Sequence, residues 1–189
     1  MNEKQQPRKV VITTLFTKFF ISILPVIFVV IVLYLLGPEI YTPAASIFLA
    51  FYFALGVGWV VAPVIGLAYG IHPVVVIGYL VFISSQSSLI VSVNYPLLEK
   101  IPLLGLYMAR LRRKAGNIIE EKEMVKKVGF VSIFWLMFLP VYGTGPNVMT
   151  LVGRLLDLEW KRVWAVVTFS AVSRFSIITT LLYYGYLNI

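Results

Sequence analysis

One arginine stands inside an otherwise uncharged apolar stretch near the end of the chain. Arg174 lies near the centre of residues 163–187. A charged side chain in the middle of a membrane helix costs about 3 kcal/mol on insertion scales. We therefore expect Arg174 to face the interior of a helix bundle or a water-filled vestibule, paired with an acid or with an anionic substrate. A structural ion pair that locks two elements together is the alternative interpretation.

A carboxylate follows the first apolar segment of the chain. Glu39 comes directly after Gly37-Pro38. Early in a half-helix, the positive end of the helix dipole would hold such a carboxylate at depth. Burial would also favour its protonated form. Glu39 is therefore a candidate for carrying a coupling proton, and an exposed loop acid is the alternative.

Further polar groups surround a turn at residues 143–147 and a serine-rich run at residues 84–88. Thr144, Gly145 and Asn147 flank exposed backbone amides. The positive N-terminus of a half-helix starting near Pro146 would suit an anion such as a phosphate head group. Serines often serve only close helix packing in membranes, but Gln86 in the serine run is a candidate for lining a pathway.

The composition excludes most enzyme chemistry. The chain has no cysteine, a single histidine (His72) and a single aspartate (Asp157). It therefore offers no thiolate or multi-histidine metal site and no cysteine nucleophile. Neither a His-Glu-x-x-His motif nor a Gly-x-Ser-x-Gly elbow occurs. We expect no catalytic residue, no bound metal and no cofactor.

The elements that position these residues are apolar. The chain is 189 residues long, 60% apolar and only 13% charged, whereas soluble domains are about 25% charged. A soluble domain of this size could not bury so much apolar surface, so the sequence predicts an integral membrane protein. The net charge of +8 fits basic residues beside membrane spans rather than a nucleic-acid partner.

Charged markers divide the chain into apolar blocks. Residues 19–37, 74–95 and 163–187 are predicted to be membrane spans, because about 20 residues of helix cross one hydrocarbon core. The basic N-terminus is expected on the cytoplasmic side. Residues 97–127 carry eight of the sixteen basic residues, namely Lys100, Arg110, Arg112, Arg113, Lys114, Lys122, Lys126 and Lys127. Three full crossings before this stretch would place those charges outside, against the orientation rule.

The conflict disappears if residues 44–70 enter and leave the membrane on one side. The predicted helix breaks in this block are Gly56, Gly58, Pro63 and Gly66, and those in residues 128–153 are Pro140, Gly143, Gly145 and Pro146. Both blocks are interpreted as re-entrant hairpins, with ordinary kinked spans as the alternative. Non-helical backbone at membrane depth requires a protein-lined or watery cavity, as in transport sites.

The predicted fold is therefore an all-α integral membrane protein with a single membrane domain over residues 1–189. About three transmembrane helices combine with two re-entrant helical hairpins. Residues 97–127 form an interfacial amphipathic linker on the cytoplasmic side, with a solvated basic linker as the alternative. The protein is expected in the cell membrane with its N-terminus cytoplasmic and its C-terminus outside.

Two sequence features resemble a known family. Residues 140–147 read Pro-Val-Tyr-Gly-Thr-Gly-Pro-Asn, and the last segment ends in Leu-Tyr-Tyr-Gly-Tyr at 182–186. The chain resembles the small multidrug export protein family, which has a similar Pro-x-x-Gly-Thr-Gly turn and a helix ending in a tyrosine–glycine pair. Glu39 resembles that family's early membrane glutamate. More distantly, the order of elements resembles the DedA/VTT superfamily of membrane proteins.

The resemblance implies movement of a lipid or a lipid-linked phosphate across the bilayer, with protons as the coupling ion, or export of drugs. DedA proteins usually carry arginines around the second hairpin's proline, where this chain has Met137 and Gly143. Arg154 and Arg174 would have to take that role. The predicted partners are membrane lipids and protons, and a homo-oligomer would enclose the pathway. The alternatives are a small-molecule exporter and a membrane scaffold that transports nothing.

Overall fold

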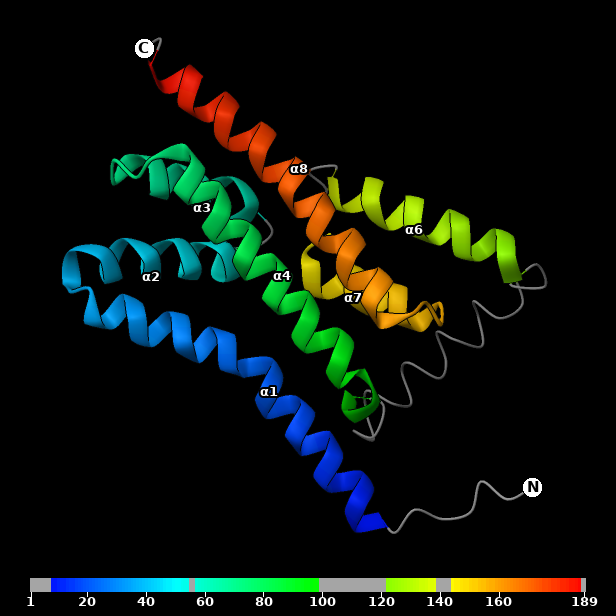
Figure 1. The fold of residues 1–189 in the computed structure, drawn as a ribbon. Coiled ribbons are helices and arrows are strands. Elements are labelled where there is room, and N and C mark those ends of the chain that lie inside the picture. The colour runs from blue at the N-terminus through cyan, green and yellow to red at the C-terminus, as the bar shows by residue number, and fades with distance from the viewer. Residues whose placement is uncertain (1–7, 55–56, 99–121, 139–143, 188–189) are drawn as a thin grey trace, which may run out of the picture.

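The described part of the chain is entirely helical. The computed structural model describes residues 8–54, 57–98, 122–138 and 144–187. These residues form seven helices (Figure 1). Their bounds are α1 (Arg8–Leu35), α2 (Pro38–Phe53), α3 (Gly58–Ala68), α4 (Pro73–Leu98), α6 (Lys122–Phe138), α7 (Pro146–Leu155) and α8 (Trp160–Leu187). The all-α prediction is confirmed for these residues.

Three of the described helices are long and apolar enough to cross a membrane. The qualifying segments are Thr17–Leu35 in α1, Pro73–Leu98 in α4 and Trp160–Gly185 in α8. Each overlaps one of the three predicted spans. In Figure 1, α4 and α8 lie against one another at the centre and run in opposite directions, with α1 packed on α4 and α6 packed on α8.

The shorter helices pair into two hairpins, α2 with α3 and α6 with α7. The first hairpin reverses between Phe53 and Gly58. A Cβ at Gly58 would lie 2.3 Å from the carbonyl oxygen of Phe51, so only glycine fits there. Pro63 was a predicted break, but the chain does not reverse there, and Pro63 is buried inside α3. A proline within a helix removes one hydrogen bond and does not by itself end the helix in a packed bundle.

The second hairpin returns at α7, which begins with Pro146. Proline suits a first helical position because its missing N–H would have no partner there. Pro146 therefore marks this break as predicted. The predicted breaks at Pro140 and Gly143 lie outside the described residues. So does most of the predicted linker at 97–127, of which residues 122–127 belong to α6.

The units α2–α3–α4 and α6–α7–α8 repeat along the chain. The long helix begins at residue 73 in the first unit and at residue 160, 87 positions later, in the second. Each short returning helix is followed by a residue in the left-handed backbone region, Gly70 at φ 74° and Asp157 at φ 54°, with the same spacing of 87. Because α4 and α8 run in opposite directions (Figure 1), the two units form an inverted repeat.

The repeat extends to the packing. Gly66 in α3 and Gly153 in α7 are buried, and the amide five residues after each donates a hydrogen bond of 3.1 Å to its carbonyl oxygen. This is the 6→1 bond that commonly closes a helix. Gly66 packs against Val76 of α4, and Gly153 packs against Val163 of α8. The glycines let each short helix approach its long helix closely, which fixes the position of the hairpins.

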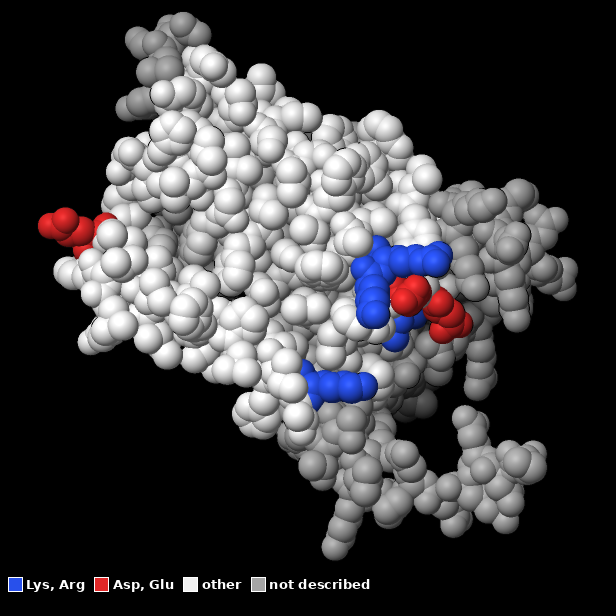
Figure 2. Space-filling model, in the orientation of Figure 1, with Lys and Arg blue, Asp and Glu red and all other residues white. Residues whose placement is uncertain are grey.

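Charged side chains are concentrated at one end of the described surface. Figure 2 shows Lys, Arg, Asp and Glu side chains gathered at the right, over the start of α8, one further basic side chain below them, and one acidic group at the left edge. The residues from the end of α7 to the first turn of α8 supply Arg154, Asp157, Glu159, Lys161 and Arg162. The surface between the two places is uncharged in this view, as expected where lipid would cover it.

Candidate functional site

Residues on either side of both hairpin breaks line a cavity of about 230 Å³. The first hairpin contributes residues on either side of its reversal. The second contributes the end of α6 and the start of α7, and α4 and α8 complete the wall. The lining residues are Phe51, Tyr52, Gly58, Trp59, Ser84, Met137, Thr144, Gly145, Pro146, Asn147, Val148, Arg174 and Phe175.

Arg174 connects the two hairpins at this cavity. Its side chain is only 4% exposed. Its Nη1 donates a hydrogen bond of 3.0 Å to the carbonyl oxygen of Met137 in α6. Its guanidinium lies 4.7 Å from the ring centroid of Trp59 in α3, within the range of a cation–π interaction. The expectation that Arg174 faces the bundle interior is therefore confirmed.

Arg174 also has two hydrogen-bond donors that it does not use. Its Nε and Nη2 are buried and, within the part of the chain that the structure describes, have no hydrogen-bond partner. The described residues include no carboxylate paired with it, since the ion pair found among them joins Arg162 and Glu159. Two adjacent donors of a buried cation are the groups that recognise two oxygens of a carboxylate or phosphate.

The start of α7 also lines this cavity. Gly145 occupies the N-cap position, and no side chain caps the helix there. Thr144 is 7% exposed. The Oδ1 atom of Asn147 is buried without a partner among the described residues. Backbone amides at a helix start attract anions, and residues 145–148 line the same cavity as Arg174.

This first turn of α7 is held in place from α4. The hydroxyl of Thr150 donates 2.6 Å to the carbonyl oxygen of Pro146 and lies 2.7 Å from the hydroxyl of Ser88. Both hydroxyls are fully buried. Because Ser88 lies on a long helix, the contact fixes the position of the α7 N-terminus relative to the bundle core.

Successive serines of α4 contact different neighbours. Ser85 accepts hydrogen bonds from Trp164 Nε1 and from the hydroxyl of Thr168 in α8. The hydroxyl of Ser87 bonds with that of Tyr52 in α2. Ser84 lines the cavity, and its fully buried hydroxyl has no partner among the described residues. The serine run therefore holds three elements together and leaves one hydroxyl at the cavity.

Three of the predicted pathway residues do not line this cavity, namely Glu39, Gln86 and Arg154. Glu39 is exposed and lines a separate, mostly apolar pocket of about 310 Å³ between α1, α2 and α4. Gln86 lines a third pocket, of about 150 Å³, and its Oε1 is buried without a described partner. The structure thus brings Thr144, Gly145, Asn147 and Arg174 together and does not bring Glu39 or Gln86 to them.

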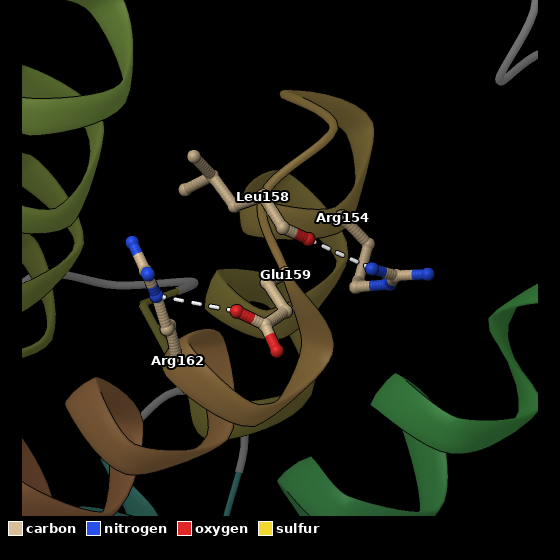
Figure 3. A network of polar contacts seen from close by, with 4 residues as sticks. All are labelled: Arg154, Leu158, Glu159 and Arg162. Atoms are coloured by element: carbon tan, nitrogen blue, oxygen red, sulfur yellow. Dashed lines mark hydrogen bonds and ion pairs between the residues drawn. The ribbon is translucent and has the colours of Figure 1, made fainter. Parts of the chain in front are cut away.

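Arg154 lies near the charged end, at the turn between α7 and α8. Its Nη1 donates a hydrogen bond of 2.7 Å to the carbonyl oxygen of Leu158 (Figure 3). Its guanidinium lies 5.1 Å from the ring centroid of Tyr95. The neighbouring pair of Arg162 and Glu159, at 3.2 Å, is exposed (Figure 3). Arg154 therefore holds the helix turn together, and Glu159 pairs with Arg162 rather than with Arg154.

Sequence reasoning did not identify several residues of the cavity. Trp59 and Ser84 were not singled out, and neither was the carbonyl oxygen of Met137. The rings of Phe51 and Phe175, 6.1 Å apart, were also missed. One signal was present, because Trp59 directly follows the glycine at the first break. The described residues contain no group of three His, Asp or Glu side chains that could hold a metal ion.

Comparison with known proteins adds nothing to these observations. No family model, no curated protein and no solved structure matches the chain.

Proposed function

We propose that the protein is a small membrane transporter of the DedA/VTT type that moves a lipid or a lipid-linked phosphate across the bilayer. The observation that carries this proposal is the environment of Arg174. A buried guanidinium with two unpartnered donors is costly to retain, and it lies at a cavity between two helix breaks. An anionic head group would satisfy those donors.

In the proposed arrangement α1, α4 and α8 span the membrane, and the two hairpins are re-entrant. The start of α2 and the end of α3 line one pocket, which supports entry and exit of the first hairpin on the same side. The charged residues from the end of α7 to the start of α8 would lie on the cytoplasmic side. The cavity would then lie near the midplane, where transport sites are found.

The proposed mechanism uses the interactions of Arg174. The bond to Met137 and the contact with Trp59 hold the two hairpin breaks together in the absence of a head group. A phosphate that binds Nε and Nη2 would compete with these contacts, since the guanidinium must turn to meet it. The breaks would then be free to separate and to pass the head group while its chains remain in lipid.

Export of a small molecule is the second candidate function. The pocket beside Glu39 favours it, because a carboxylate at the rim of an apolar, tyrosine-containing pocket of about 310 Å³ suits an apolar amine. Efflux of a lipophilic fluorescent amine from proteoliposomes, lost with Glu39→Gln and kept with Arg174→Gln, would support this function over lipid movement.

The test of the main proposal is lipid movement in liposomes that contain the purified protein. The movement between leaflets of a fluorescent phospholipid and of a polyprenyl phosphate is followed with and without a proton gradient. We expect movement with the wild-type protein and none with Arg174→Gln. Arg162→Gln is the matched control, because it removes an exposed arginine. Unchanged movement with Arg174→Gln, or no movement of either lipid by the wild type, would refute the proposal.

A further inference from the structure

We infer that the cavity selects a singly charged phosphodiester whose head group also carries a hydrogen-bond donor, such as a glycerol hydroxyl. This inference rests on the proposed function and narrows the class of substrate. The features that point to it are the single charge at the cavity, the pair of free donors on Arg174 and the unpartnered polar atoms of Asn147 and Ser84.

The charge at the cavity matches one negative charge. Arg174 is the single charged residue among those that line it. The undescribed residues 55–56 and 139–143, which lie next to the lining residues in sequence, contain no charged residue either. The N-terminus of α7 adds at most about half a unit of positive charge. A phosphate monoester carries close to two negative charges at neutral pH, so burying it here would leave part of its charge uncompensated.

The donors match the two free oxygens of a diester. Nε and Nη2 of Arg174 are adjacent and unpartnered, whereas Nη1 is held by Met137. Such a fork bonds two oxygens of one group. Both atoms are covered in this conformation, so binding requires the guanidinium to turn into the cavity. A phosphodiester offers two unesterified oxygens and one charge, which fits both the fork and the single cation.

The remaining polar atoms call for a donor on the ligand. Asn147 Oδ1 can only accept a hydrogen bond, and the hydroxyl of Ser84 can donate or accept. Both atoms are buried without a partner among the described residues. A head group with hydroxyls would satisfy them, whereas a choline head group has no donor. The cost of leaving a buried acceptor unpaired therefore discriminates between two diesters of equal phosphate chemistry.

The volume limits what part of a lipid enters. Pockets for whole drug-sized ligands measure roughly 300–1,000 Å³, whereas this cavity measures about 230 Å³. It accommodates a head group and leaves the chains outside. The same phosphodiester chemistry occurs in a free glycerophosphodiester, so the experiment must separate a lipid from a soluble compound.

Binding to the purified protein in detergent tests the inference. The probes are dihexanoyl phosphatidylglycerol, phosphatidylcholine and phosphatidic acid, together with soluble glycerophosphoglycerol. We expect phosphatidylglycerol to bind about tenfold more tightly than phosphatidylcholine, the factor for about one hydrogen bond, and more tightly than phosphatidic acid at pH 7.5. Binding of phosphatidylglycerol alone identifies a lipid, and equal binding of glycerophosphoglycerol identifies the free diester. Phosphatidic acid or phosphatidylcholine binding as tightly as phosphatidylglycerol would overturn the inference.

Two substitutions at one residue test the role of the acceptor. Asn147→Leu should weaken phosphatidylglycerol binding about tenfold and leave phosphatidylcholine binding unchanged, whereas an unchanged affinity for phosphatidylglycerol refutes the role of Oδ1. If that variant does not fold, Asn147→Asp keeps the shape and adds a charge that competes for Arg174. It should weaken phosphatidylglycerol binding at least tenfold, and wild-type affinity would contradict the inference.

Different results would refute the inference and the proposed function. Lipid movement that depends on Arg174 but favours phosphatidic acid over phosphatidylglycerol would leave the function standing and refute the selectivity. The predicted binding preference without any lipid movement in liposomes would support the selectivity and refute transport.

Discussion

Replacing Arg174 with methionine separates a binding arginine from a structural one. Methionine has a similar length and can fill the space apolarly. The substitution removes the charge-assisted bond to Met137, worth about 1.5–3 kcal/mol, and the contact with Trp59, worth about 2 kcal/mol when desolvated. It also removes two buried unpartnered donors, each of which costs about 1–3 kcal/mol. These contributions largely offset one another, so we expect the free energy of unfolding to stay within about 2 kcal/mol of wild type.

The measurement is unfolding of the detergent-solubilised protein by titration with a denaturing detergent, followed by tryptophan fluorescence. Phe175→Ala is the matched control, because the neighbouring Phe175 is 2% exposed and its truncation should cost about 3–5 kcal/mol. A comparable loss for Arg174→Met, about 3–5 kcal/mol, is what breaking a buried structural charge pair would give. That outcome would refute the reasoning and favour a scaffold whose arginine only holds the fold.

The packing and the topology give four further predictions. Gly153→Ala should destabilise the protein by about 1–2 kcal/mol, because the new Cβ would lie 2.9 Å from two methyl groups of its neighbour. Gly78→Ala, with no atom within 4 Å of its Cβ, should stabilise it by about 0.5–1 kcal/mol, and the same unfolding titration measures both. Ser88→Ala combined with Thr150→Val in a double-mutant cycle should show a coupling of about 0.6 kcal/mol; a coupling near zero would contradict the buried bond. A single cysteine at Leu97 should be labelled in vesicles from the cytoplasmic side only, and labelling from outside only would exclude the proposed hairpin topology.

The sequence was most informative where a residue conflicts with its surroundings. A charge inside an apolar segment is readable without a structure, and the environment of Arg174 confirms that it faces inward. A cluster of glycine and proline is equally readable, and α7 does begin at Pro146. The break in the first hairpin was also marked by a glycine, since α3 begins at Gly58, whereas Pro63, another predicted break, lies inside α3.

Relations between distant residues were not readable. Neighbouring serines point about 100° apart on a helix, so only the packed structure separates Ser84 at the cavity from Ser85 beside α8. Glu39 and Arg174 looked like parts of one pathway because both are charges in apolar surroundings. Their placement in separate pockets depends on where the first hairpin ends, and local sequence does not encode that distance.

The inverted repeat bears on how such a site could originate. If the two units descend from one ancestral segment, that segment inserted into the membrane in two opposite orientations, and a copy in one orientation paired with a copy in the other. With a spacing of 87 residues, Ser87 in the first unit corresponds to Arg174 in the second. Each contacts the first helix of its own unit: Ser87 bonds with Tyr52 in α2, and Arg174 bonds with Met137 in α6. A symmetrical pair would have carried the same residue twice, and two buried guanidinium groups would repel one another. Under this origin, joining the copies in one chain would allow one position to keep a small polar side chain while the other gained a charge.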